Sequence, residues 1–292
     1  MNLRDFEVFK TIVESGSFSK ASERLYIAQP SLSKTIQRME KSLGVTLFER
    51  SNRINRLTEE GRIVYEKAIA VLQQMKELQY QLQDSNEHVQ GHVKVGLPQI
   101  IGTFFFPKVA KALSKKHPGV SLEIVEEGGL GVERLVEKGE VDVAFVVIPA
   151  RSKELEERLI FEAPFVACLP SEHFLKDERQ IALAQLAQED WILFDPTFAL
   201  RQVVLESCRR ERFVPNIAYS TTQWDLLLAL VREGLGVAIV PRPLIEMGGQ
   251  GLIVKEIGSQ YIPWKIGVVV KKNAYQAQAL LAFLKMVTDV YE

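Results

Sequence analysis

The chain is poor in the residues that build disulfide frameworks and metal sites. It holds 2 cysteines and 4 histidines among 292 residues, and the pair Cys168 and Cys208 cannot form a framework of several bridges. No stretch approaches the ~20 apolar residues that span a bilayer, and the N-terminus MNLRDFEVFK has no apolar signal core. These absences argue against a secreted, disulfide-stapled protein and predict a cytoplasmic protein that has no membrane partner.

Motifs typical of enzymes are missing as well. The four histidines, His88, His92, His117 and His173, are scattered and show no HExxH spacing. There is no GxSxG nucleophile elbow, and Gly128–Gly131 (GGLG) does not match the GxGxxG or P-loop patterns. We therefore predict that the chain is not an enzyme and that it needs no metal and no cofactor.

Charge is distributed unevenly along a chain whose formal net charge is only −1. Residues 1–57 carry ten Lys/Arg against six Asp/Glu, a net charge of +4, so the remainder carries −5. A length of 292 residues is enough for two or three domains. A mildly basic head on an acidic body is consistent with a nucleic-acid-binding module joined to a second domain.

The head, residues 1–58, has the pattern of three short helices. Apolar residues at helical spacing predict a first helix over Leu3–Ser15, ended by Gly16. Ser17 or Ser19 can cap a second helix that turns Ala21, Leu25 and Tyr26 inward. A third helix starts with Ser31, or with Gln29 just before it, and ends near Leu43; Pro30 fits the first helical position. Residues 18–37 thus have the pattern of a helix-turn-helix, which places its second helix in the DNA major groove.

The polar face of the third helix and a following hairpin wing are the candidate DNA contacts. Hydroxyls and amides can read base edges, and cations can bind phosphates. Arginines at every third position of the wing can enter a minor groove or clamp the backbone. The alternative is a three-helix module with a solvated polar face. The predicted contacts are Gln29, Pro30, Ser31, Ser33, Lys34, Gln37 and Arg38 on the helix, and Arg50, Arg53 and Arg56 on the wing.

A long helical pattern follows over residues 59–85, before a polar hinge that ends near residue 90. Its apolar positions alternate steps of four and three, which is an a/d heptad seam. The seam predicts pairing with a second subunit; the alternative is an amphipathic helix lying on its own domain. The seam residues are Val64, Ala68, Val71, Met75, Leu78 and Leu82.

The body, residues 91–292, begins in βαβαβ order and continues with a second α/β unit. This order predicts a parallel sheet with helices on its faces. Two such units in series predict two lobes with a ligand cleft at loops that follow strands. Exposed N–H groups, hydroxyls and one arginine there suit a small carboxylate or other anion. The predicted effector-binding residues are Gln99, Ile100, Thr103, Gly129, Ile148, Thr197, Phe198, Arg201 and Thr222.

The run AQPSLSKTIQRMEKSLGVTLFER through LTEEG resembles the N-terminal domain of LysR-type bacterial transcriptional regulators. Ser22 departs from the alanine usual in that family, and Lys34 stands where arginine is commoner. GHVKVGLPQIIG, HPGVSLEIVEEG, VEKGEVDVAFVV and LVREGLGVAIVP resemble the family's effector-binding part, so the resemblance covers nearly the whole chain.

The resemblance implies an α/β protein overall, with an all-α-type winged helix-turn-helix head, a dimerising linker helix and a two-lobed effector domain similar to type II periplasmic binding proteins. Lobe I would comprise residues 91–162 and 267–292, and lobe II residues 163–266. Implied partners are a pseudo-palindromic site on double-stranded DNA, a second copy of the chain, RNA polymerase and a small effector. The implied assembly is at least a dimer, with a tetramer expected.

Redox sensing is the alternative function. Some LysR-type proteins sense oxidants through a cysteine pair, and here Arg209 and Arg210 adjoin Cys208. Neighbouring arginines can lower the pKa of a thiol and make it reactive. The ordinary interpretation, two buried or incidental cysteines, competes with this one.

Overall fold

The structure is a computed structural model that describes residues 1–49, 56–83 and 89–291. The chain divides into two compact units, Met1–Ser85 and Asn86–Glu292. Each unit has its own hydrophobic core. No helix of the described residues is long and apolar enough to cross a membrane.

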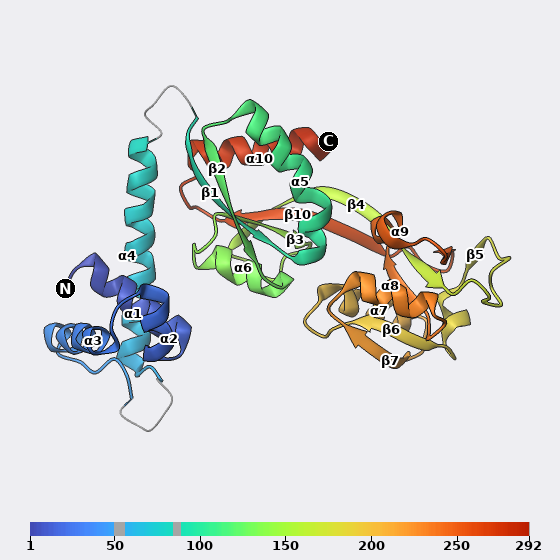
Figure 1. The fold of residues 1–292 in the computed structure, drawn as a ribbon, viewed down its shortest axis with the longest axis horizontal. Helices are drawn as coiled ribbons and strands as arrows, with labels where there is room; N and C mark the ends of the chain where they lie inside the picture. Colours follow the sequence, from blue (N-terminus) through green and yellow to red (C-terminus); the bar gives the residue numbers. More distant parts are fainter. Residues whose placement is uncertain (50–55, 84–88, 292) are drawn as a thin grey trace. The chain divides into compact units, whose positions relative to one another are not determined.

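The described residues of unit 1 form the helices α1 (Leu3–Ser15), α2 (Phe18–Leu25), α3 (Gln29–Leu43) and α4 (Glu59–Gln83) (Figure 1). The first helix starts with a capping box between Asn2 and Asp5, and Ser17 caps α2. These caps explain why the helices begin where the sequence predicts. The expected inward position of Tyr26 is wrong, because this residue ends α2 in a left-handed conformation and its side chain is 96% exposed.

The base of the predicted wing is held by backbone contacts. Phe48 and Leu57 form an antiparallel bridge, and Glu49 N–H donates to the Arg56 carbonyl at 2.8 Å. The first turn of α4 then lies against this base, since a Cβ on Gly61 would come within 2.1 Å of the Leu47 carbonyl oxygen. A side chain at position 61 would force these segments apart. Residues 50–55, which hold Arg50 and Arg53, lie outside the described residues.

The first part of the predicted heptad seam packs inside unit 1. Ala68 is fully buried in its core and Val64 is half-buried against the same core. Ala68 therefore has no surface to offer a second subunit, which corrects its assignment to the pairing seam. Further along α4, Val71 and Met75 are half-buried, and Leu78 is 48% exposed. The side chain of Leu82 lies outside the described part of the chain.

Unit 2 alternates strands and helices. Its first part holds β1 (Gly91–Leu97), α5 (Gln99–Lys116), β2 (Val120–Glu126), α6 (Gly129–Glu137), β3 (Val143–Val147) and the long β4 (Leu155–Leu169). Its second part holds β5 (Gln180–Ile181), the 3-10 turn η1 (Leu183–Leu186), β6 (Asp190–Phe194), α7 (Ala199–Arg210), β7 (Asn216–Thr221), α8 (Trp224–Arg232), β8 (Ala238–Pro241), α9 (Arg242–Gly248) and β9 (Ile253–Ile257). The chain closes with β10 (Pro263–Lys271) and α10 (Gln278–Tyr291).

The strands form a mixed sheet rather than the purely parallel one expected. Strand order is β2-β1-β3-β10-β4-β9-β5, with β8 also paired to β4. Strands β1, β2 and β3 pair in parallel, but β10 runs antiparallel to both β3 and β4. The difference arises because β4 and β10 are continuous strands that carry the chain out of the first lobe and back, which a pattern of local elements does not predict. A separate parallel pair joins β6 and β7.

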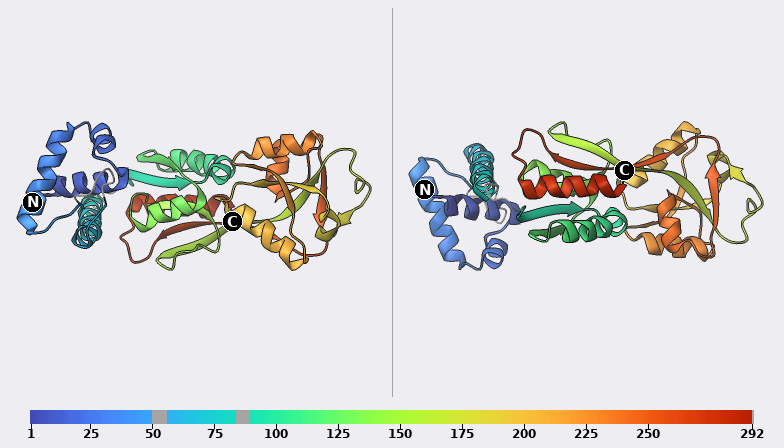
Figure 2. Two further views of the ribbon diagram at one scale, coloured as in Figure 1. Left: turned by 90° about the horizontal axis from the view of Figure 1, so that it is seen from below. Right: turned by 90° about the horizontal axis from the view of Figure 1, so that it is seen from above.

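Strand β4 divides unit 2 into two lobes. Its first part, up to Pro164, pairs with β10, and its last five residues pair with β8 and β9. Both views of Figure 2 show the lobe that holds β5 to β9 at the far end of β4 and β10. The first lobe is a three-layer structure, with α5 and α10 on one face of the sheet and α6 on the other (Figure 1).

Alternation along β3 shows how the first lobe fills both faces. Val143 and Phe145 belong to the large core with α5 and α10, whereas Ala144 and Val146 pack with α6. Apolar residues on both faces of one strand are typical of a sheet covered on both sides. This packing brings the N-terminal ends of α5 and α6 to the same edge of the sheet, after β1 and β2.

Candidate functional site

Helix α3 presents a polar surface opposite its buried face. Leu32, Ile36 and Met39 are buried in the core of unit 1. Gln29, Pro30 and Ser31, in the first turn, are exposed. Residue 28 is alanine, so no side chain caps this helix. The Ser31 and Leu32 N–H groups donate to the Ala28 carbonyl and Pro30 has no N–H, so this turn favours an anion such as a phosphate through the positive end of the helix dipole and its exposed polar side chains.

The remaining predicted DNA contacts on α3 differ in their exposure and in whether their side chains are already hydrogen-bonded within unit 1. Lys34 and Gln37 are exposed, whereas Ser33 is half-buried. Arg38 donates a hydrogen bond to Asp5 of α1, whose side chain is buried. Asp5 also accepts from the Asn2 backbone N–H at 2.9 Å. Arg38 thus ties α3 to the start of α1, a structural contact that spacing on one helix could not predict.

Arg56 is the predicted wing arginine that the structure describes, and it is exposed. Its backbone closes the base of the wing through the bond to Glu49. Together with the first turn of α3 and Lys34, it gives unit 1 an exposed set of amides, hydroxyls and cations. Such a set can bind the phosphate backbone and read base edges of a duplex.

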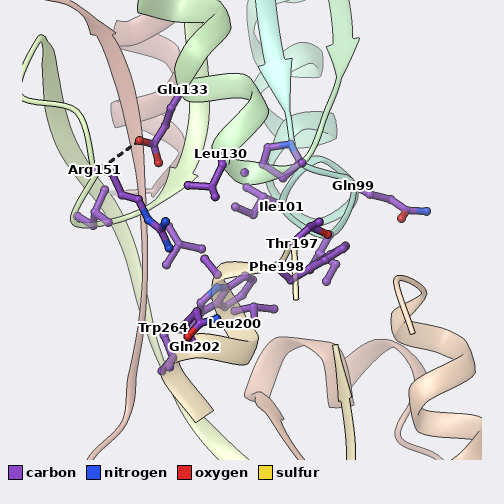
Figure 3. A pocket seen from close by; sticks show the side chains of 18 of the residues that line it. Gln99, Ile101, Leu130, Glu133, Arg151, Thr197, Phe198, Leu200, Gln202 and Trp264 are labelled. Atoms are coloured by element: carbon purple, nitrogen blue, oxygen red, sulfur yellow. Dashed lines mark hydrogen bonds between the residues drawn. The ribbon is translucent and has the colours of Figure 1, made fainter. Parts of the chain in front are cut away.

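Unit 2 contains a cavity of about 660 Å³ between its two lobes. The first lobe contributes the loops after β1, β2 and β3, and the second contributes the start of α7 (Figure 3). The volume falls in the range of small-molecule sites. The lining residues are Pro98, Gln99, Ile100, Ile101, Glu126, Glu127, Gly128, Gly129, Leu130, Glu133, Val147, Ile148, Pro149, Arg151, Thr197, Phe198, Ala199, Leu200, Gln202, Val203, Glu206 and Trp264.

Three helices begin at this cavity. Gln99 starts α5, Gly129 starts α6 and Ala199 starts α7, and each of these residues lines it. None of the three helices has a side-chain N-cap. Their first-turn N–H groups and the positive ends of their dipoles favour an electron-rich ligand group.

Six of the nine predicted effector-binding residues line the cavity: Gln99, Ile100, Gly129, Ile148, Thr197 and Phe198. Not all of their polar groups are free. Thr197 N–H and Oγ1 donate to Asp195 at 3.0 and 2.8 Å, and these bonds lower the pKa of the Asp195 carboxyl. In Figure 3 the Gln99 side chain points away from the other labelled residues.

Three predicted residues lie outside the cavity. Thr103 Oγ1 donates to the Gln99 carbonyl of its own helix. Arg201 Nη1 donates to the Phe194 carbonyl and to Ser220 Oγ, each at 2.9 Å, so it joins α7 to the ends of β6 and β7. Thr222 is exposed and does not line the cavity. These residues are near strand ends, as predicted, but their side chains serve local structure or face solvent.

Arg151 and Trp264 are lining residues that the sequence prediction missed. Arg151 lies in the segment after β3 and is the only lining residue, of those the structure describes, with a positive charge. Trp264 is fully buried on β10, more than 100 residues along the chain. Strand ends predicted the first-lobe loops 97–103, 128–131 and 147–149, the last of which stops two residues before Arg151. The position of Trp264 depends on the return of β10 through the first lobe, which local patterns do not predict.

Four carboxylates also line the cavity, and two of them are bound to backbone N–H groups. Glu127 accepts from Gly128 N–H at 3.4 Å, at the start of α6. Glu133 is buried, accepts from Arg151 N–H at 3.0 Å, and has a pKa raised by burial. Glu126 and Glu206 are exposed. The lining therefore includes carboxylates, whereas the predicted anion site consisted of N–H groups, hydroxyls and one arginine.

The two cysteines are buried and unpaired. Burial raises the pKa of the Cys168 thiol far above its ordinary value, and raises that of Cys208 to about 12. The expected lowering by Arg209 and Arg210 is therefore not found, since both arginines are exposed and desolvation dominates. Buried thiols that stay protonated react poorly with oxidants.

Comparison with known proteins agrees with this geometry. Residues 3–62 match the model "Bacterial regulatory helix-turn-helix protein, lysR family", and residues 86–292 match "LysR substrate binding domain". The chain is 32% identical to the "Uncharacterized HTH-type transcriptional regulator YwbI" of Bacillus subtilis, over 98% of this chain and 95% of that one.

Solved structures share the fold at lower identity. A single-residue variant of full-length OxyR from Pseudomonas aeruginosa gives a TM-score of 0.74 at 22% identity, with both chains covered completely. Full-length CbnR, solved in complex with its target DNA, gives 0.67 at 21% identity and covers 99% of this chain and 100% of that one.

Proposed function

The chain belongs to the LysR family of bacterial transcriptional regulators, and on that premise we propose how it acts. The first turn of α3, with Gln29, Ser31 and Lys34, contacts the major groove and its phosphates. Arg56 contacts the flanking backbone. Two heads of a dimer read a pseudo-palindromic promoter site, because half-site symmetry mirrors protein symmetry.

The observation that carries this proposal is the two-faced character of α3. Its apolar side is committed to the core through Leu32 and Met39, while its uncapped first turn is exposed. A helix that merely stabilised the unit would gain from a side-chain cap at position 28, worth about 1 kcal/mol. Without such a cap the positive end of the helix dipole stays open to phosphate oxygens.

A small effector bound in the 660 Å³ cavity controls this activity. The cavity is lined by both lobes, so a ligand there bonds to both and favours one arrangement of them. Such a ligand changes DNA affinity only by as much as it prefers one arrangement over the other. Assembly through α4, a tetrameric state and contact with RNA polymerase belong to the same proposal.

Selection from a random-sequence duplex pool tests the DNA-binding part. The full chain should enrich sites with an inverted repeat, and Gln29→Ala should relax base preference within each half-site. An enriched pool without two-fold symmetry would contradict dimeric reading. Equal loss of affinity for all sequences in Gln29→Ala would contradict direct readout by this residue.

Redox control is the less favoured mechanism. Both thiols are buried and have raised pKa values, so neither is poised to react with peroxide. A reporter driven by an enriched site measures the response of the chain to peroxide, with and without Cys168 and Cys208. Loss of a peroxide response on replacing both cysteines would favour redox control over a small effector.

A further inference from the structure

Two residues that line the cavity between the lobes carry hydrogen-bond donors that lack a partner among the described residues. The Arg151 guanidinium makes no hydrogen bond or ion pair there; the residue's bond to Glu133 comes from its backbone N–H. The indole Nε1 of Trp264 is buried and has no acceptor. A buried donor without an acceptor is uncommon in folded proteins. Both residues line the same cavity.

We infer that Arg151 and the Trp264 Nε1–H recognise the anionic group of the effector, and that the effector is a monocarboxylate with an apolar body. This inference rests on the proposed function of the cavity as the effector site. It replaces Arg201, whose guanidinium is bonded to Phe194 and Ser220, with a different arginine as the anion-recognition residue.

The position of Arg151 is set by a buried contact. Glu133 of α6 accepts from the Arg151 backbone N–H, which fixes where the residue leaves the segment after β3. Figure 3 shows the Arg151 side chain extending from there toward Phe198, Leu200 and Gln202 of the other lobe. The backbone bond fixes the Cα position and leaves the exposed side chain able to bind a carboxylate through two parallel N–H bonds.

The rest of the lining explains why one negative charge, and not two, is expected. The uncapped starts of α5, α6 and α7 favour an anion. Glu127 and Glu133 are already bonded to backbone N–H groups. Glu126 and Glu206 remain exposed on the wall and would repel a second carboxylate of the ligand.

Apolar side chains define the remainder of the ligand. Ile100, Ile101, Leu130, Leu200 and Val203 line the cavity. The ring of Phe198 stacks on Phe194, with centroids 5.4 Å apart. A hydrocarbon or aromatic body would bury its surface against these groups.

The test uses the full chain and two series of matched probes: 3-phenylpropanoate, 3-phenylpropan-1-ol and 3-phenylpropylamine, and hexanoate, hexan-1-ol and hexylamine. Binding is measured by titration calorimetry and by the shift in melting temperature. The acid of at least one series should bind more tightly than its alcohol and amine. Arg151→Ala should lower the affinity for the acid about tenfold or more. Arg151→Lys should lower it less, because lysine keeps the charge but not the paired bonds.

Two further variants separate recognition from loss of fold. Lys153→Ala removes an exposed cation two residues away that does not line the cavity, and should leave affinity unchanged. Trp264→Phe keeps an aromatic ring beside Phe104 and Phe105 but removes the N–H together with part of the indole. It should weaken binding of the acid, and the unbound chain should melt at a lower temperature because the smaller ring leaves a cavity in the core, so binding is measured below that temperature.

The outcomes distinguish this inference from the proposed function. Gly129→Phe fills the cavity, and a Cβ at this position meets no atom within 4 Å, so the chain should still fold. Acid binding that survives Gly129→Phe would place the ligand elsewhere and overturn the proposed effector site. Three results would overturn the inference about Arg151 and the monocarboxylate while leaving the proposed effector site intact. The first is binding abolished by Gly129→Phe but unaffected by Arg151→Ala. The others are tighter binding of the amine or alcohol than of the acid, and no binding of either acid.

Discussion

The buried carboxylate of Glu133 accepts a hydrogen bond of 3.0 Å from the backbone N–H of Arg151, 18 residues further along the chain. The contact joins α6 to the segment that follows β3, on the wall of the inter-lobe cavity. Because Glu133 is buried, its charged form loses hydration, and the pKa of its carboxyl is raised. Protonation of the Glu133 carboxyl is therefore linked to the hydrogen bond that holds the segment after β3 on the cavity wall.

Glu133→Gln should flatten the pH dependence of stability. With a pKa raised above the unfolded value of 4.5, the folded chain binds this proton more tightly than the unfolded chain. The contribution of Glu133 to stability should then fall as pH rises from about 4.5 through the folded pKa. The glutamine cannot titrate and removes this part of the slope.

Tryptophan fluorescence during urea unfolding measures this effect in unit 2, since all three tryptophans, Trp191, Trp224 and Trp264, lie there. Glu126→Gln is the control, because it removes an exposed carboxylate from the same cavity wall. A Glu133→Gln slope equal to that of the native chain would show that this group does not contribute.

Lys34→Ala should weaken DNA binding and reduce its salt dependence. An exposed lysine that neutralises one phosphate contributes about 0.9 to the slope of log K against log salt concentration. Lys41→Ala, which removes an exposed cation from the last turn of the same helix, is the matched control. A Lys34→Ala slope as steep as that of the control would contradict a phosphate contact.

Arg38→Ala should destabilise unit 1 rather than act only on DNA affinity. The change leaves the buried Asp5 carboxylate with one partner fewer, at a cost of about 1 kcal/mol. Hydrogen exchange of α1 and α3 should become faster. Arg4→Ala breaks an exposed pair with Glu7 and should change little. Equal exchange in Arg38→Ala and the native chain would return Arg38 to the candidate phosphate contacts.

The native chain should react very slowly with a thiol reagent such as dithionitrobenzoate. Cys168 and Cys208 are both fully buried, and their raised pKa values keep the reactive thiolate scarce. Two thiols per chain should react after denaturation. Rapid labelling of either cysteine in the native chain would instead revive redox sensing.

Sequence patterns predicted the local elements better than the contacts between them. The first helix was predicted over its observed bounds, because Asn2 and Gly16 at its ends act within a few residues. The roles of Arg38 and Arg201 were not predicted, since their partners Asp5 and Ser220 are brought near only by tertiary packing. The place of Arg151 in the cavity was not predicted for the same reason, because the opposite wall is formed by residues of the second lobe, further along the chain.

Leu78→Lys should weaken self-association of the chain. Leu78 is 48% exposed on α4 and continues the heptad seam beyond the part that Ala68 commits to the core of unit 1. If the exposed end of the seam pairs with a second copy, a lysine there buries a charge or pulls the helices apart. Sedimentation velocity over a concentration series measures the dissociation constant.

Ile63→Lys provides the matched control for this pairing. Ile63 is 54% exposed on the same helix but lies off the seam, so the substitution adds the same charge without entering the predicted interface. Leu78→Lys should raise the dissociation constant by tenfold or more relative to Ile63→Lys, which corresponds to about 1.4 kcal/mol. The same dissociation constant for both variants would assign the association to other surfaces of the chain, and α4 would then serve as a connecting helix only.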